Sequence, residues 1–392
     1  MMEFGYVCTQ CGNTYTIDPQ VMVCPSCAKH QPTDQPLVGI LEVAFSGTVD
    51  KNFDVHDLLP VERQYFPPIP VGNTPLWRPS NLRRETGFNN LFIKDDGANP
   101  TSSFKDRASF LVSAFAGKFG IRDIVLASTG NAGSSMAGVG AAAGQRVTLF
   151  LPEAAPAAKL VQALQYGATV HRVRGNYDLA YDLSMTFSVK KGGMNRNTAY
   201  NPMTIEGKKT VSLELYQQLK GTPDYIFVAT GDGCILAGVY KGFRDLKRLG
   251  LIDRIPVVYS VQAETSDALY RAFHTGTFEN IPTRTIADSI CVDVPRNGFH
   301  ALEQLKKYGG CVITVSDQMI LDAQVRLSRS TGLFTEPAGA AAFAGFLKVR
   351  SELPTDAIIV LLATGNGLKD SASAEKGITV PETTITDIET IL

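Results

Sequence analysis

The sequence predicts an α/β protein built on parallel sheets, and three observations support this fold class. Short apolar, β-branched runs alternate with longer stretches in which apolar residues recur at helical spacing. Strand, helix and strand at this interval imply parallel sheets that helices cover on both faces. Hydrophobic residues make up 44% and charged residues 19% of the 392 residues, which is typical of globular chains. At about 150 residues per domain, this length predicts two or three domains.

Four N-terminal cysteines, Cys8, Cys11, Cys24 and Cys27, form two C-x2-C pairs with twelve residues between them. Two such turns meeting face to face supply the four thiolates of a closed, structural zinc site, so we expect a zinc ribbon bound to Zn2+. Two disulfides or four free thiols are the alternatives, and both suit a cytoplasmic chain less well. Nucleic-acid binding is the functional alternative for a ribbon, but Lys29 is its only lysine or arginine, which disfavours it.

The rest of the chain divides into a linker and an alternating region. Residues 31–70 are proline-rich, and we interpret them as a linker and an extended entry into the main body. Strands are expected at 91–94, 123–127, 146–151, 168–173, 224–229, 256–261, 311–315 and 357–363, and helices at 106–119, 156–166, 206–220, 235–249 and 317–330.

Three of the expected strands are each followed by nearly the same polar sequence. These tails are Ser128–Gly133, Thr230–Cys234 and Thr364–Leu368, each with a Thr-Gly-Asn or Thr-Gly-Asp core. In open parallel sheets, ligands bind outside the carboxyl ends of the strands, where glycine lets backbone N–H groups approach an anion. We therefore expect the three loops to surround one small molecule.

Charge and missing motifs exclude several classes of function. The chain has 37 Lys and Arg against 38 Asp and Glu, so it lacks the basic excess that attracts nucleic acids or anionic membranes. No apolar stretch approaches the length of a membrane span, and the first residues lack the pattern of a signal peptide, which predicts a cytoplasmic protein. The segment Gly231–Gly238 matches neither the dinucleotide nor the P-loop fingerprint, which disfavours a nucleotide-binding protein. The zinc-protease motif H-E-x-x-H is absent, and Gly133–Ala137 differs from the serine-hydrolase motif G-x-S-x-G at its last residue.

Lys105 is the candidate for covalent chemistry. It lies in Asn99–Arg107, just after a polar turn and at the start of an apolar helix. Burial there favours the neutral amine, the form that attacks a carbonyl and makes a Schiff base. Taken alone, a solvated lysine at a helix start is the more common explanation.

Further motifs decide between these interpretations, because here the sequence resembles the fold-type II pyridoxal-phosphate enzymes, and among them the threonine synthases. The matching stretches are Gly72–Leu76, Asn99–Arg107, Ser128–Ala132, Asn201–Thr210, Glu336–Ala340 and Ala363–Asp370. They occur in the family's order over about residues 70–370, and part of that family has a zinc-ribbon-like N-terminal extension. The resemblance implies two doubly wound domains of the tryptophan synthase β-like kind after a small zinc ribbon, and a homodimer.

The resemblance also assigns residues to roles, with pyridoxal 5'-phosphate as the cofactor. Lys105 matches the lysine that holds the cofactor as a Schiff base and moves the α-proton, and Asn131 matches the asparagine at the cofactor's phenolic oxygen. Thr364 matches the hydroxyl at the pyridine nitrogen. The residues that match the loop for the cofactor phosphate are Gly231, Asp232, Gly233, Cys234 and Ile235. Those that match the loop for the substrate's α-carboxylate are Ser128, Thr129, Asn131 and Ala132.

The sequence departs from this family at two places. Asp232 stands where an asparagine is usual beside the cofactor phosphate, and we expect its side chain to turn away and cap the following helix. Ala199 and Thr204 stand where many threonine synthases have a serine and an arginine that hold the substrate's phosphate. Arg196, Lys208 and Lys209 are the nearby cations that could take their place.

These patterns lead to one main hypothesis for the function. We expect a small ribbon at 1–36, a large domain from 37–105 and 206–392, and a small domain at 106–205, with the cofactor between the two domains. The main hypothesis is a threonine synthase that converts O-phospho-L-homoserine and water to L-threonine and phosphate. The alternatives are a pyridoxal-phosphate serine or threonine dehydratase, or another amino-acid ammonia-lyase such as one acting on diaminopropionate, and a zinc-ribbon regulatory protein with a degenerate enzyme body.

Overall fold

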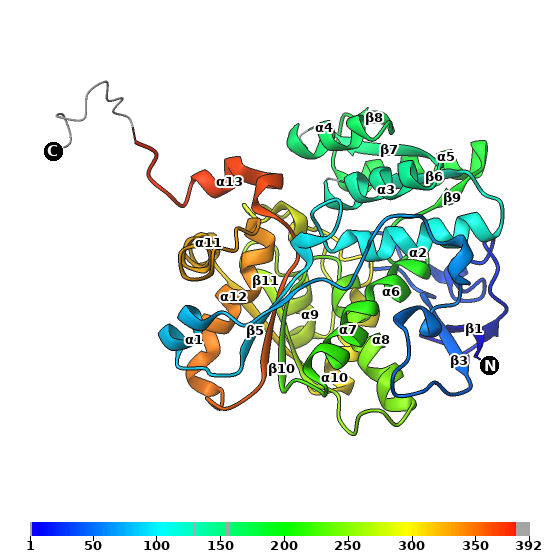
Figure 1. The fold of residues 1–392 in the computed structure, drawn as a ribbon. Helices are drawn as coiled ribbons and strands as arrows, with labels where there is room; N and C mark the ends of the chain where they lie inside the picture. The colour runs from blue at the N-terminus through cyan, green and yellow to red at the C-terminus, as the bar shows by residue number, and fades with distance from the viewer. Residues whose placement is uncertain (1, 129, 154, 156, 382–392) are drawn as a thin grey trace.

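The computed structural model describes residues 2–128, 130–153, 155 and 157–381, and it contains three sheets (Figure 1). The largest has six strands in the order β12 (Cys311–Val315), β11 (Val257–Ala263), β10 (Tyr225–Ala229), β13 (Ile359–Ala363), β5 (Leu91–Asp95) and β4 (Leu76–Trp77). Its neighbours pair in parallel except at the edge, where β4 is antiparallel to β5. Five of the eight expected strands lie in this sheet as parallel neighbours, and the other three lie in the second sheet.

The second sheet is smaller and entirely parallel. Its strands lie in the order β8 (Thr169–Val173), β7 (Arg146–Pro152), β6 (Asp123–Ala127) and β9 (Met194–Asn195). The helices of this part are α3 (Asn131–Ala142), α4 (Ala157–Gln165) and α5 (Tyr177–Lys191). All its strands fall within residues 123–195, while the six-stranded sheet takes strands from both flanks of that segment.

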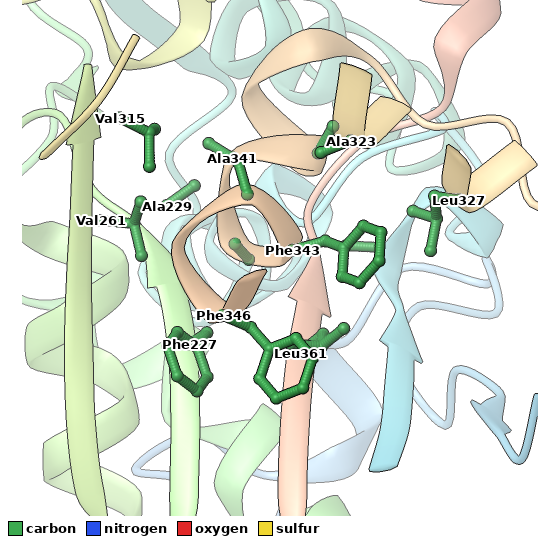
Figure 2. Packing of buried hydrophobic residues seen from close by; sticks show 14 of the residues in the cluster. Phe227, Ala229, Val261, Val315, Ala323, Leu327, Ala341, Phe343, Phe346 and Leu361 are labelled. Carbon is green, nitrogen blue, oxygen red and sulfur yellow. The ribbon is translucent and has the colours of Figure 1, made fainter. Parts of the chain in front are cut away.

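Helices cover both faces of the six-stranded sheet because its strands are apolar on both sides. Along β10, Phe227 and Ala229 pack into the cluster that contains α12 (Pro337–Val349), whereas Ile226 and Val228 pack into the cluster that contains α8 (Cys234–Arg248). In Figure 2, α12 crosses this face with its aromatic residues against the strands, and the rings of Phe227 and Phe346 lie 5.7 Å apart. This two-sided burial is the reason that parallel strands have continuous apolar sequences.

The remaining helices complete the layers. They are α1 (Ser80–Thr86), α2 (Lys105–Lys118), α6 (Met203–Lys208), α7 (Thr210–Leu219), α9 (Ala268–Thr275), α10 (Gly298–Lys307), α11 (Asp317–Thr331) and α13 (Ser371–Glu375). The single helix expected at 206–220 is two helices, α6 and α7. No helix in the described part of the chain is long and apolar enough to cross a membrane.

The third sheet lies at the N-terminus and corrects the interpretation of residues 31–70 as a linker. Its order is β2 (Thr14–Tyr15), β1 (Glu3–Cys8) and β3 (Leu41–Ser46), and β3 pairs antiparallel with β1 along its full length. Leu41, Val43 and Phe45 are buried, so part of the expected linker is a core strand. The sheet therefore extends past residue 36, and the three domain boundaries stay a prediction.

Candidate active site

The residues predicted for chemistry lie at the carboxyl ends of strands, where the two larger sheets face each other. Asn131 begins α3 after β6, Gly231–Gly233 connect β10 to α8, and Thr364 follows β13. All of them line one cavity, which encloses about 400 Å³ including its mouth and also contains Lys105 and Glu336. The structure thus brings the three similar loops together around a single space.

Lys105 is held in this cavity by contacts between distant parts of the chain. It is the first residue of α2, and the preceding residues pair with the segment after β13: Ser103 bridges Gly365, and the N–H of Phe104 donates to the carbonyl of Thr364 at 2.8 Å. Burial lowers the pKa of Lys105 to about 8, with Lys208 and Arg196 acting in the same direction and Asp232 against it. A larger fraction of this amine is therefore neutral near pH 7 than of an ordinary lysine.

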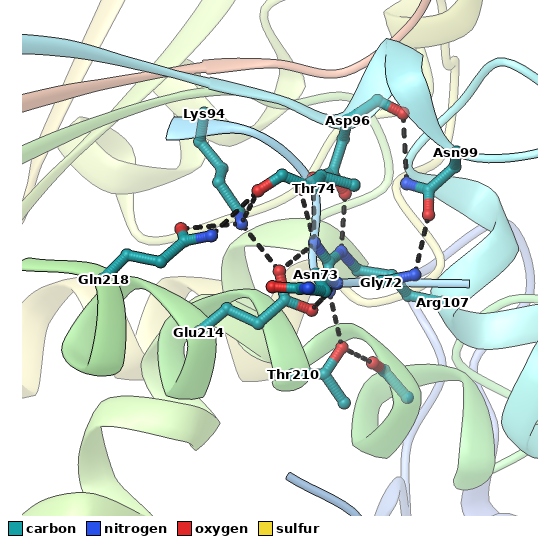
Figure 3. A network of polar contacts seen from close by, with 11 residues as sticks. Gly72, Asn73, Thr74, Lys94, Asp96, Asn99, Arg107, Thr210, Glu214 and Gln218 are labelled. Carbon is teal, nitrogen blue, oxygen red and sulfur yellow. Dashed lines mark hydrogen bonds and ion pairs between the residues drawn. The ribbon is translucent and has the colours of Figure 1, made fainter. Parts of the chain in front are cut away.

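A buried ionic network fixes the start of α2 from the other side (Figure 3). Arg107, two residues after Lys105, donates to Asp96 and to Glu214, and Lys94 donates to Glu214 at 2.6 Å. The backbone N–H groups of Gly72 and Asn73 donate to the side chains of Asn99 and Glu214, at 3.0 and 2.7 Å. Two of the sequence motifs, Gly72–Leu76 and Asn99–Arg107, therefore meet in a network that positions Lys105.

The loop after β10 has the donors that a phosphate needs. Within the described chain, no hydrogen bond is found for the backbone N–H groups of Gly231, Asp232 and Gly233, and the positive end of α8 begins at the next residue. A Cβ at Gly231 would lie 2.8 Å from the Cα of Ile290, so only glycine fits this close approach. Free amides beside a lysine and a buried amide oxygen of Asn131 without a partner fit pyridoxal phosphate.

Asp232 caps the start of α8 as expected, but it does not turn away from the site, because it lines the cavity and its charge acts on Lys105; Cys234 is not among the lining residues. The carboxylate of Asp232 accepts a hydrogen bond from the N–H of Cys234, the first residue of α8, at 2.8 Å. Burial opposes its ionisation, but the positive charges of Lys208 and Lys105 hold the pKa of Asp232 below its usual value. The thiol of Cys234 is fully buried in an apolar cluster with Ile40 and Ala199, and Cys234 lines neither this cavity nor the one that adjoins it.

A second cavity adjoins the first, since both contain Lys105, Asn131, Asp232 and Ser289. It encloses about 670 Å³ including its mouth and is lined by Ser128 and Ala132 from the loop expected to bind the α-carboxylate. The hydroxyl oxygen of Ser128 accepts from the N–H groups of Gly130 and Gly133 at 3.0 and 2.9 Å, which leaves its own proton free to donate. Thr129, the remaining predicted member, lies outside the described residues.

Two charged side chains near the two cavities, Lys159 and Asp288, carried no clear signal in the sequence. Lys159 of α4 forms an ion pair at 2.6 Å with Asp288, which lies in the 3-10 helix η5 (Asp288–Ile290), and so joins the part built on the small sheet to the part built on the large one. Asn131 donates to Glu336 at 2.6 Å, and burial raises the pKa of this glutamate. A lysine on an amphipathic helix usually lies in solvent, so no local pattern could have identified Lys159.

The four N-terminal cysteines also come together. Their sulfur atoms all lie within 4.8 Å of one another, with Cys8 and Cys27 at 3.8 Å and Cys11 and Cys24 at 3.6 Å. Four sulfurs at about 2.3 Å from a central Zn2+ would be about 3.8 Å apart, whereas a disulfide needs about 2.05 Å. The cluster therefore suits a metal and does not suit disulfides.

The loops, the lysine and the paired sheets are those of a fold-type II pyridoxal-phosphate enzyme. Residues 69–365 match the family described as "Pyridoxal-phosphate dependent enzyme". A threonine synthase of Methanocaldococcus jannaschii is 34% identical over 389 residues, covering 94% of this chain and 93% of that protein. A threonine synthase of Halalkalibacterium halodurans is 36% identical over 315 residues, covering 79% and 86%. The chain belongs to the threonine synthase family.

Solved structures agree in fold at lower identity. The processed form of threonine deaminase isoform 2 from Solanum lycopersicum superposes with a TM-score of 0.69 at 21% identity, covering 82% of this chain and 90% of that chain. Diaminopropionate ammonia lyase from Escherichia coli gives 0.67 at 18% identity, covering 82% and 90%. These likenesses place the fold among fold-type II enzymes and confirm the fold class expected from the sequence.

Proposed function

We propose that this chain converts O-phospho-L-homoserine and water into L-threonine and phosphate. The Cγ–O bond breaks and phosphate leaves with the bonding electrons, while the hydroxyl of water adds at Cβ. One Cβ hydrogen is in effect moved to Cγ, which becomes the methyl group, and the remaining proton of water accompanies the phosphate. The observation that carries this proposal is Lys105, which lies where a cavity with free loop amides meets a cavity lined by Ser128 and Ala132.

Each residue of the site has a role in this proposal. When bound, pyridoxal phosphate supplies an electron sink that stabilises negative charge at Cα. Lys105 holds the cofactor and moves the proton at Cα, and the loop Gly231–Ile235 binds the cofactor phosphate through its amides. Asn131 and Thr364 orient the ring. The neutral hydroxyl of Thr364 does not hold the pyridine nitrogen protonated as a carboxylate would, so the cofactor is a weaker electron sink and favours elimination and replacement at Cβ or Cγ. The loop that contains Ser128 and Ala132 receives the α-carboxylate. The homodimer and the cytoplasmic location belong to the same proposal.

A second candidate is a serine or threonine dehydratase, or another amino-acid ammonia-lyase. It is favoured by one observation: Ala199 is fully buried among apolar residues, and the hydroxyl of Thr204 donates to the carbonyl of Asn201. Neither of these positions provides a group for a substrate phosphate.

An assay of the holoenzyme with competing substrates separates the candidates. We expect phosphate release from O-phospho-L-homoserine, matched by threonine formation, to exceed ammonia release from serine, threonine and diaminopropionate by at least roughly 100-fold in kcat/KM, because only a phosphorylated substrate places a leaving group at Cγ. Ammonia release as the dominant activity would replace the proposal with the second candidate.

We also propose that the cysteine cluster binds one structural Zn2+. The Cys24→Ser variant is expected to bind zinc at least about 100-fold more weakly and to melt at a lower temperature, because the metal supplies folding free energy to a ribbon with a small core. Zinc content by elemental analysis and thermal unfolding measure both effects. Cys311→Ser, outside the ribbon, is the matched control and should keep its zinc; equal zinc content in both variants would contradict the assignment.

A further inference from the structure

Arg196 is a buried cation for which no ion pair is found in the described part of the chain. Arg196 is only 1% exposed, and among the described residues its Nε has no hydrogen-bond partner and its one side-chain hydrogen bond runs from Nη2 to Ser109 at 3.4 Å. No carboxylate of the residues that the structure describes lies within ion-pair distance of its guanidinium, and the charges of Asp232 and Asp106 act on it only from beyond that distance. Arg107, which is equally buried, donates to two carboxylates. A guanidinium buried without a counter-ion is costly, so its natural partner is an anion that arrives from outside.

This guanidinium lies where a substrate would be. Arg196 follows β9, and its backbone N–H donates to the carbonyl of Val125, the middle residue of β6, which fixes it beside that strand. The side chain lines the second cavity together with Lys105 and Ser128. It is close enough to Lys105 for its charge to help lower the pKa of that amine.

The other cations near the cavity are already engaged. Arg296, which also lines it, pairs with Asp178 and lies 4.7 Å from the centre of the Tyr181 ring. Lys209 pairs with Glu206 and Asp245, away from the cavity. Lys208 donates to the hydroxyl of Thr198 at 3.3 Å and offsets the charge of Asp232, and unlike Arg196 it does not line the cavity. Arg196 is therefore the cation most available to a second anion in this space.

We propose that Arg196 binds the phosphate group of the substrate and so makes this site specific for an amino acid with an anionic group at its far end. The inference rests on the proposed function, in which a phosphate leaves from Cγ. The same cavity has the Ser128 loop for the α-carboxylate, so a substrate with an anion at each end satisfies both. Arg196 thus replaces the phosphate-binding side chains that are absent at Ala199 and Thr204, and the planar guanidinium suits a phosphate through paired hydrogen bonds.

A pair of ligands tests this role without turnover. 2-Amino-5-phosphonopentanoate carries a phosphonate where the substrate has its phosphate ester, and L-norvaline is the same molecule without that group. By calorimetric titration of the holoenzyme, Arg196→Gln should bind the phosphonate roughly 10- to 150-fold more weakly than the wild type, the loss expected for hydrogen bonds to a charged group. Its affinity for norvaline should stay within about twofold of the wild type. Arg196→Lys should have an intermediate affinity for the phosphonate, because lysine keeps the positive charge but lacks the planar pair of N–H donors.

Two controls make the result decisive. Arg146→Gln removes an exposed arginine from β7 of the same sheet and should bind both ligands as the wild type does. Arg196→Gln should melt no lower than the wild type, since no ion pair is lost. Equal weakening of both ligands, or an unchanged affinity for the phosphonate, would overturn the role of Arg196. Failure of the wild type to release phosphate from O-phospho-L-homoserine is a separate outcome that overturns the proposed function.

Discussion

Lys105→Ala is expected to lower the release of phosphate from O-phospho-L-homoserine by at least about 10³-fold, to the background of the assay. The variant loses both the amine that holds the cofactor and the base that moves the α-proton, and no other described lysine amine lines the cavity that contains the loop amides. The protein should still fold, because no hydrogen bond or ion pair of the Lys105 side chain is found among the described residues. Loss of the visible absorbance of the bound cofactor provides a second measurement.

The matched control lies on the same helix. Lys118 is the last residue of α2, and its half-exposed amine pairs with Glu62 on the surface. Lys118→Ala should keep its absorbance and nearly all of its activity. A Lys105→Ala enzyme with more than about a tenth of wild-type turnover would rule out the assigned role of this lysine.

Arg107→Met is expected to destabilise the protein by about 3–5 kcal/mol, the cost of removing one partner from a buried ionic network. The variant leaves Asp96 and Glu214 buried without the guanidinium that both accept from. Burial alone would raise the pKa of Glu214, but Arg107 and Lys94 hold it at about 2. This depressed pKa means that the network stabilises the wild type above pH 4.5 and that this contribution is lost as the pH falls from 4.5 towards 2.

The unfolding midpoint in urea, measured at pH 7 and again at pH 4, checks this expectation. Arg107→Met should unfold at a much lower urea concentration than the wild type at pH 7, and the gap should narrow in acid. Arg146→Met removes an exposed pair with Asp123 and should change stability by less than about 1 kcal/mol. A similar small effect for both variants would show that the buried network does not stabilise the fold.

The sequence predicted the strands better than the helices, for a physical reason. Strands such as β10 and β13 are short apolar runs because both faces of the sheet are covered, and such runs can be recognised in the amino-acid sequence alone. Helices α3 and α12 were not expected because they are rich in Gly and Ala and are buried nearly all round, so they lack an amphipathic period. The strand β3 was missed because the prolines around residues 31–36 and 67–70 suggested a linker.

The loops of the site were predictable from the sequence, but the ion pairs between side chains around the cavity were not. The repeated Thr-Gly tails located Asn131, the loop at Gly231 and Thr364, because parallel strands bring their carboxyl ends to one edge. Whether a given cation has a partner depends on residues far away in the chain. Within the residues that the structure describes, Lys209 has two carboxylate partners and Arg196 has none, yet the sequence offered both as equivalent candidates.

The pairing of Ser103 with Gly365 has a consequence for the order of events during synthesis. The six-stranded sheet takes β5 from the first quarter of the chain and its neighbour β13 from the last, so it cannot be completed until nearly the whole chain has left the ribosome. The four-stranded sheet, within residues 123–195, has only short connections to close and can form first. The segment after β13, which pairs with the residues just before Lys105, is therefore added late. A chain that is released before this segment is made lacks one of the loops that line the cofactor cavity.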